Sequence, residues 1–108
     1  MKTIEVFISE EAVDDLEAGK AFYDEKELGV GQFFIECLLA DLGSLRFYAG
    51  IHGKHFGCFR MLSKRFPFAI YYCFVKSAVE VLAVLDTRRN PACLSKQVSE
   101  RKDQRKKD

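Results

Sequence analysis

The segment Arg65-Phe-Pro-Phe-Ala-Ile-Tyr-Tyr-Cys-Phe-Val-Lys-Ser-Ala-Val-Glu-Val-Leu-Ala-Val-Leu-Asp-Thr-Arg-Arg-Asn-Pro91 decides the fold. It contains two apolar runs, residues 68–75 and 79–86, separated by only three residues. This pattern predicts two strands joined by a hairpin turn. Because both faces of each run are apolar, we expect helices to cover one face and a partner or a tail to cover the other. Arginines bracket the hairpin, so it presents fixed positive charge to a phosphate or a carboxylate.

Two helices are expected before this hairpin. Ser9 is suited to cap a helix that begins with Glu10 and Glu11, two acids that favour the positive end of a helix dipole. Apolar residues then recur at helical spacing until near Lys26, and again over residues 30–45 after a turn that contains two glycines. The pattern therefore predicts a helical hairpin with one apolar side.

Shorter strand signals lie on either side of the two helices. Residues 3–8 form a β-type run, and residues 58–62 follow a glycine-rich loop at 50–57. The order β-α-α-β-β-β predicts an α+β fold, in which a helical hairpin packs on one face of an antiparallel sheet. The opposite face and its rim are left for function. The expected core residues are Phe33, Phe34, Leu38, Leu42, Phe68, Ile70, Tyr72, Val81, Ala83 and Leu85.

Length and composition indicate one domain. The chain has 108 residues and is 48% apolar, which is enough for a core of its own. We expect the domain to span residues 1–94 and a basic tail, helical or disordered, to span 95–108. The four cysteines lack zinc-ligand spacing and are read as buried reduced thiols, so no metal and no cofactor are expected. No signal peptide or membrane-spanning run is seen, which favours a cytoplasmic protein.

Charge is divided unevenly along the chain. Residues 1–45 hold three Lys/Arg and eleven Asp/Glu, a net charge of −8, whereas residues 46–108 hold fourteen and five, a net charge of +9. Such an asymmetry predicts an electropositive face that attracts an anionic partner. A solvated helix face and a solvated tail would give the same asymmetry without any partner.

Taken in order, these segments resemble the RelE/ParE superfamily of type II toxins. The resemblance rests on the acidic first helix, the Gly-containing helical hairpin, Arg60 on the next strand, and two motifs. These motifs are Arg65-Phe-Pro-Phe-Ala-Ile-Tyr-Tyr72 and Val81-Leu-Ala-Val-Leu-Asp-Thr-Arg-Arg-Asn-Pro91. The resemblance covers residues 4–94 and is specific for the superfamily rather than for one activity.

One branch that the resemblance suggests is catalytic. RelE-like members are ribosome-dependent mRNA endoribonucleases, whose reaction needs a base, an acid and cations on the phosphate. The resemblance implies that Arg60, Arg65 and Arg88 would supply the cations, and that Lys54 and His55 are the candidate bases.

The other branch needs a binding surface only, because ParE-like members poison DNA gyrase by binding. Nuclease members tend to carry a Tyr or His near the C-terminus, but no Tyr, His, Phe or Trp follows Pro91 here. Asp86 stands where many relatives carry a His. These departures favour the gyrase branch, for which the predicted binding residues are Arg60, Arg65, Tyr72, Asp86, Arg88 and Arg89. Ordinary cross-strand ion pairs of Arg60 or Arg65 with Glu80 or Asp86 are an alternative.

The resemblance therefore implies the toxin of a plasmid-stabilising toxin–antitoxin pair. Its expected partners are an acidic antitoxin and DNA gyrase, with operator DNA contacted only through the antitoxin complex and no membrane involved. Two alternatives remain: a ribosome-dependent mRNA endoribonuclease, and a non-toxic regulator that only binds its antitoxin.

Overall fold

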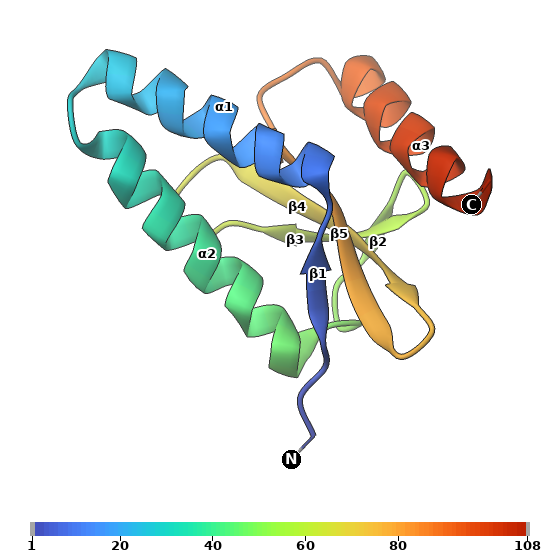
Figure 1. The fold of residues 1–108 in the computed structure, drawn as a ribbon. Coiled ribbons are helices and arrows are strands. Elements are labelled where there is room, and N and C mark those ends of the chain that lie inside the picture. Colours follow the sequence, from blue (N-terminus) through green and yellow to red (C-terminus); the bar gives the residue numbers. More distant parts are fainter. Residues whose placement is uncertain (1, 108) are drawn as a thin grey trace.

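A central sheet with helices on both faces forms the protein, as seen in a computed structural model that describes residues 2–107 (Figure 1). The elements are β1 (Val6–Ile8), α1 (Glu10–Lys26), α2 (Val30–Tyr48), β2 (Lys54–His55), β3 (Cys58–Leu62), β4 (Phe68–Val75), β5 (Ala78–Asp86) and α3 (Pro91–Lys107). The five strands lie in the order β1-β5-β4-β3-β2. The predicted α+β fold with a helical hairpin on the sheet is confirmed. The pairing of β1 with β5 is parallel, so the sheet is only mostly antiparallel.

Side-chain hydrogen bonds hold the start of α1 and the turn between α1 and α2. Ser9 caps α1, since its Oγ accepts a hydrogen bond from the amide of Ala12 at 3.1 Å. The turn into α2 passes through Gly29 at φ 95°, in the left-handed region. Asp24 Oδ1 accepts a hydrogen bond from the amide of Gly31 at 2.8 Å, and this bond holds the pKa of the Asp24 carboxyl below its ordinary value.

The two helices approach closely at glycine positions. A Cβ atom on Gly31 would lie 2.5 Å from the carbonyl oxygen of Lys20, and a Cβ on Gly19 would lie 2.6 Å from the ring of Phe34. The first obstacle is backbone, so it cannot rotate aside.

We therefore expect Gly31→Ala to lower the free energy of unfolding by about 1–3 kcal/mol, through overpacking between the helices. The matched control is Gly43→Ala on the same helix, because nothing lies within 4 Å of a Cβ at Gly43. That change should be neutral or stabilise by up to about 1 kcal/mol, as alanine is the better helix former. Urea unfolding of both variants measures the difference, and equal effects would contradict the close helix approach.

The core on the hairpin side is rich in aromatic rings. Phe34 is fully buried, and its ring centroid lies 5.1 Å from that of Phe66 and 4.8 Å from that of Phe68. Phe33 was expected in the core as well, but its side chain is 49% exposed because the neighbouring position on α2 points away from the sheet.

A bulge in β5 divides the predicted core between two faces. Tyr71 pairs with Ala83 and Tyr72 pairs with Val81, which leaves Leu82 as an extra residue. Val81 therefore faces Phe34, as expected, whereas Ala83 and Leu85 belong to a second core on the other face. The sequence prediction assumed unbroken alternation and was wrong for these two residues.

Helix α3 covers part of that second face. Leu94 and Val98 are buried there against a cluster made of Cys58, Ala69, Tyr71, Leu82, Ala83 and Leu85. Figure 1 shows α3 on the side of the sheet opposite the α1–α2 hairpin. The sheet face that the sequence analysis left open for function is therefore partly closed by the chain itself.

Ion pairs hold α3 against α1 and β5. The guanidinium of Arg101 donates to both carboxylate oxygens of Asp15, at 2.6 and 3.0 Å, and to the carbonyl of Leu82 at 3.0 Å. Asp15 also accepts a hydrogen bond from the amide of Val84 at 2.9 Å. The Arg101–Asp15 pair thus bonds to the backbone of β5 where its pairing with β1 has ended.

A second arginine of α3 extends these contacts. Arg105 donates to Glu11 at 3.2 Å, and its Nε lies 3.1 Å from Glu80 as an ion pair without hydrogen-bond geometry. Part of the charge asymmetry between the two halves of the chain is thus satisfied within the molecule.

Candidate functional site

The charged end of the sheet carries Asp86 and Arg88, two of the predicted binding residues. Arg88 donates to the Asp86 carboxylate from its backbone amide, its Nε and its Nη2, at 2.8, 3.0 and 2.7 Å. These bonds hold the pKa of Asp86 below its ordinary value. Arg88 also lies beside Tyr23, whose hydroxyl has a pKa raised by burial and partly lowered again by the arginine. The carboxylate is therefore neutralised by its own neighbour.

Two further arginines lie at or near this end. Arg89 lines a cavity of about 210 Å³ together with Asp86, Phe22 and Phe68. Arg65 lies exposed in the loop between β3 and β4. The end of the sheet thus presents cations next to one paired acid.

Arg60 faces the other side of the sheet. It pairs across the strands with Tyr71, which belongs to the core beneath α3, whereas Asp86 pairs with Phe68 of the hairpin-side core. Burial raises the pKa of the Tyr71 hydroxyl and the neighbouring Arg60 lowers it in part. The structure therefore does not bring Arg60 and Arg88 to one face. The alternative ion pairs predicted across the sheet do not form either, since Glu80 pairs with Arg105 and Asp86 with Arg88.

Tyr72, predicted as a binding residue, is fully buried. Its hydroxyl oxygen accepts a hydrogen bond from the amide of Gly50 at 2.9 Å and lies 2.5 Å from Nδ1 of His52. Burial lowers the pKa of His52, which favours the neutral ring. Tyr72 and His52 thus fix the loop before β2, and Tyr72 has no exposed surface for a partner.

The candidate bases Lys54 and His55 form the short edge strand β2 and are both exposed. Lys54 Nζ lies 5.0 Å from the ring centroid of Phe59. A tight turn follows, in which Phe56 and Gly57 both have positive φ, at 58° and 82°. This turn places the strand beside α3, because Lys102 Nζ donates to the carbonyl of Gly57.

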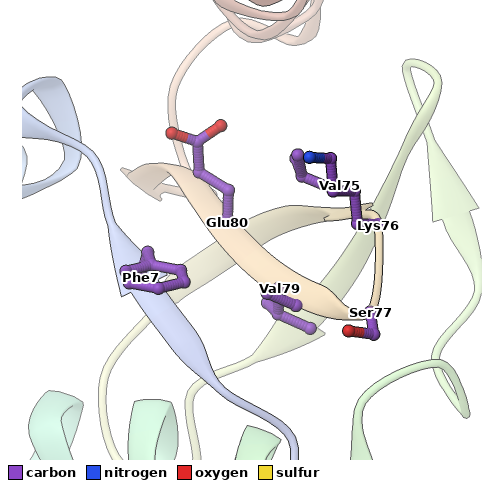
Figure 2. Close-up of a pocket in the computed structure, with 7 residues that line it drawn as sticks. Phe7, Val75, Lys76, Ser77, Val79 and Glu80 are labelled. Carbon is purple, nitrogen blue, oxygen red and sulfur yellow. The ribbon is translucent and has the colours of Figure 1, made fainter.

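Sequence reasoning missed a groove on the α3 side of the sheet, near the β4–β5 turn. A cavity of about 400 Å³ lies between Phe7 of β1 and Val75 of β4, with Lys76 at its rim (Figure 2). Figure 2 shows Glu80 reaching up from β5 toward α3. A second cavity of about 560 Å³ adjoins it at Val75. It is lined by Lys54, Gly57, Phe59, Cys73, Phe74, Val75, Lys102 and Arg105.

The groove combines an apolar floor with a cationic rim. Phe7 is 54% exposed and Val75 is 48% exposed, so the floor is open to a partner. Lys54, Lys76 and Lys102 supply positive charge around it. The sequence carried two weak signals for this groove. Residues 3–8 form a β-type run with apolar side chains on both faces, and basic residues recur at helical spacing near the C-terminus.

Residues 2–107 contain no group of three or more His, Cys, Asp or Glu side chains placed to hold a metal ion. Among the same residues, no helix has the length and apolarity that crossing a membrane requires.

Comparisons with known proteins bear on the fold of the chain. No family model matches the sequence, and no curated protein matches it significantly. Among solved structures, the chain is similar to one described as the chromosomal ParDE TA system from P. aeruginosa. The TM-score is 0.73 at 14% sequence identity, and the match covers 80% of this chain and 98% of the other. The protein therefore has the α+β fold of a chain in a ParDE system.

Proposed function

We propose that this chain is the toxin of a type II toxin–antitoxin system. The observation that carries the proposal is the fold shared with a chain of a ParDE system, over nearly the whole of that chain. The two motifs around Arg65 and Pro91 independently suggest the same superfamily. We place the protein in the cytoplasm, with operator DNA contacted only through the antitoxin complex.

The groove on the α3 side suits an acidic, amphipathic antitoxin segment. Its apolar residues would lie on Phe7 and Val75, and its acids would meet the lysines of the rim. Ordering such a segment costs a few kcal/mol, so apolar contact must supply most of the affinity. We therefore expect the dissociation constant to depend only mildly on salt.

Removing the apolar floor should weaken this complex. Phe7→Ala is expected to weaken the binding free energy by about 1–3 kcal/mol, because it truncates an aromatic side chain that the partner would bury. The matched control is Leu62→Ala, which is 55% exposed but lies at the other end of the sheet. Calorimetric titration of both variants with the antitoxin measures the difference. Equal losses, or a complex that dissociates on going from low to moderate salt, would contradict the groove as the binding site.

The proposed target is DNA gyrase, inhibited by binding. Candidate groups for phosphate chemistry are divided between the two faces of the sheet, and Arg88 is engaged by Asp86. This division supports a binding surface around Arg65, Arg88 and Arg89 more than a single catalytic centre.

Two assays on purified protein test the target: gyrase supercoiling, and cleavage of mRNA on programmed ribosomes. We expect the protein to inhibit gyrase. Arg65→Ala and Arg89→Ala should each weaken its binding to gyrase by about 1–3 kcal/mol. The control is Lys96→Ala, which removes an exposed cation from α3. Cleavage of mRNA in the ribosomal A site would contradict the gyrase proposal and support the ribonuclease alternative, provided that Arg65→Ala or Lys54→Ala lowers the cleavage rate by about 10²-fold. Inactivity in both assays would favour the non-toxic regulator.

A further inference from the structure

Two cysteines lie opposite one another on neighbouring strands. Phe59 of β3 pairs with Tyr72 of β4, and continuing this register by one residue places Cys58 opposite Cys73. Both belong to the α3 side of the sheet, where Cys58 is part of the second core and Cys73 packs against it. Alternation thus places two thiols side by side.

The hydrogen-bond pattern fixes the kind of position they share. Arg60 donates its amide to Gly53 on the β2 side at 2.9 Å, whereas Ser63 donates its amide to Phe68 on the β4 side at 2.8 Å. Even-numbered residues of β3 therefore bond away from β4, and Cys58 opposite Cys73 is a non-hydrogen-bonded position. Opposed Cα atoms at such positions lie about 4.5 Å apart. This spacing falls within the ~4.4–6.8 Å range over which disulfides form.

Access to the two thiols differs. Cys58 is 1% exposed, whereas Cys73 is half-buried and lines the cavity of about 560 Å³ beside β2 and α3. A small molecule in that cavity meets Cys73 first, and Cys58 lies behind it. This is the arrangement of an entry thiol and a resolving thiol.

Charges around the cavity favour an anionic reagent. Lys54 from β2 and Lys102 and Arg105 from α3 line it with Cys73, and Glu80 of β5 is the acid that faces the thiol. Glu80 is itself paired with Arg105. Burial raises the pKa of both thiols, and Lys102 offsets part of that rise in each. Cys73 should therefore attack more slowly than a solvent-exposed thiol, and it should react preferentially with anionic reagents.

We propose that Cys73 and Cys58 form a thiol–disulfide exchange site for an anionic small disulfide of the glutathione type. The Cys73 thiolate attacks one sulfur of the reagent, which gives a mixed disulfide and releases one tripeptide thiolate that takes up the proton lost by Cys73. The Cys58 thiolate then attacks the Cys73 sulfur and releases the second tripeptide thiol. Overall, the two protein thiols lose two electrons and two protons to the reagent, and a Cys58–Cys73 disulfide ties β3 to β4.

Mass spectrometry after incubation with glutathione disulfide tests the site. The background protein carries Cys37→Ser and Cys93→Ser, which removes the two other thiols. We expect it to lose the mass of two hydrogens and to retain no adduct. Adding Cys58→Ser should leave one glutathionyl group on Cys73, and adding Cys73→Ser should leave the folded protein unmodified. Cys58→Ala repeats the first variant with an apolar side chain in the buried position.

Three outcomes would overturn the proposal. These are two thiols that stay free in the folded protein, a stable adduct on Cys73 while Cys58 is present, and modification of Cys58 when Cys73 is absent.

A second arm tests the charge preference. Cystamine, a cationic disulfide, is compared with glutathione disulfide, and each rate is divided by the rate for the same protein unfolded in urea. We expect glutathione disulfide to be favoured by about 10-fold or more at low salt, because cations steer anions toward Cys73. The preference should shrink with added salt and in Lys54→Gln. An equal or reversed preference would overturn the choice of an anionic reagent.

Discussion

Phe34→Ala should lower the free energy of unfolding by about 3–5 kcal/mol, a large share of the stability of a domain this size. The Phe34 side chain is fully buried and its ring contacts those of Tyr23, Phe66 and Phe68, with centroids 4.8 to 5.2 Å away. Truncation removes these contacts and leaves a cavity between α2 and the sheet, which the rigid neighbours cannot close.

The preceding residue provides the control for this prediction. Phe33 is chemically identical and adjacent on α2, but it is 49% exposed. Phe33→Ala should therefore cost about 1 kcal/mol or less. Thermal and urea unfolding of the two variants compare them directly. A melting temperature of Phe34→Ala equal to that of the wild type would show that α2 faces the sheet differently.

Arg101→Ala should cost about 3–5 kcal/mol, because it leaves the Asp15 carboxylate buried without its partner. The side chains of Arg101 and Asp15 are 13% and 11% exposed, and the pair bonds to the β5 backbone as well. Removing the arginine leaves the carboxylate without its counter-charge, with only the Val84 amide as a donor, and leaves the carbonyl of Leu82 with only the 3.5 Å bond from Ser9 Oγ.

Two variants separate this effect from a general loss of α3 charge. Arg105→Ala removes the ion pairs with Glu11 and Glu80, and it should cost about 1 kcal/mol or less. The Arg105 side chain is 30% exposed and its partners are 36% and 23% exposed, so solvent screens both pairs more than that of Arg101. The double variant Asp15→Leu with Arg101→Met should recover much of the loss, because an apolar pair of similar size needs no partner charge. Denaturant unfolding of the three variants is the measurement. A single variant Arg101→Ala as stable as the wild type would contradict a docked α3.

The sequence was sufficient where periodicity controls structure. Apolar spacing and the Ser9 cap predicted the helical hairpin, and the two apolar runs predicted the β4–β5 hairpin. The bulge at Leu82 was not predictable from alternation, because it is stabilised by distant groups, Ser9 and Arg101, that bond its carbonyl. For the same reason, unbroken alternation from Val81 placed Ala83 and Leu85 on the wrong face of the sheet.

The C-terminal region shows a different limit of sequence reasoning. Residues 95–108 are mostly charged, and composition alone predicted a basic tail that is helical or disordered. Leu94 and Val98 pack in the second core, and Arg101 finds its partner in α1, 86 residues earlier. Long-range ion pairs of this kind carry no local signal. The groove beside α3 and the Cys58–Cys73 pair were missed because both depend on that helix and on strand register.

The most direct test of the proposed toxin role is co-expression with the product of the gene next to this one, followed by purification through a tag on one chain. We predict that a small acidic protein with an amphipathic segment co-purifies and remains bound at moderate salt, and that Phe7→Ala weakens its retention while Leu62→Ala does not. Failure of this chain to form a complex with either neighbouring gene product, with both chains folded, would contradict the assignment to a toxin–antitoxin pair.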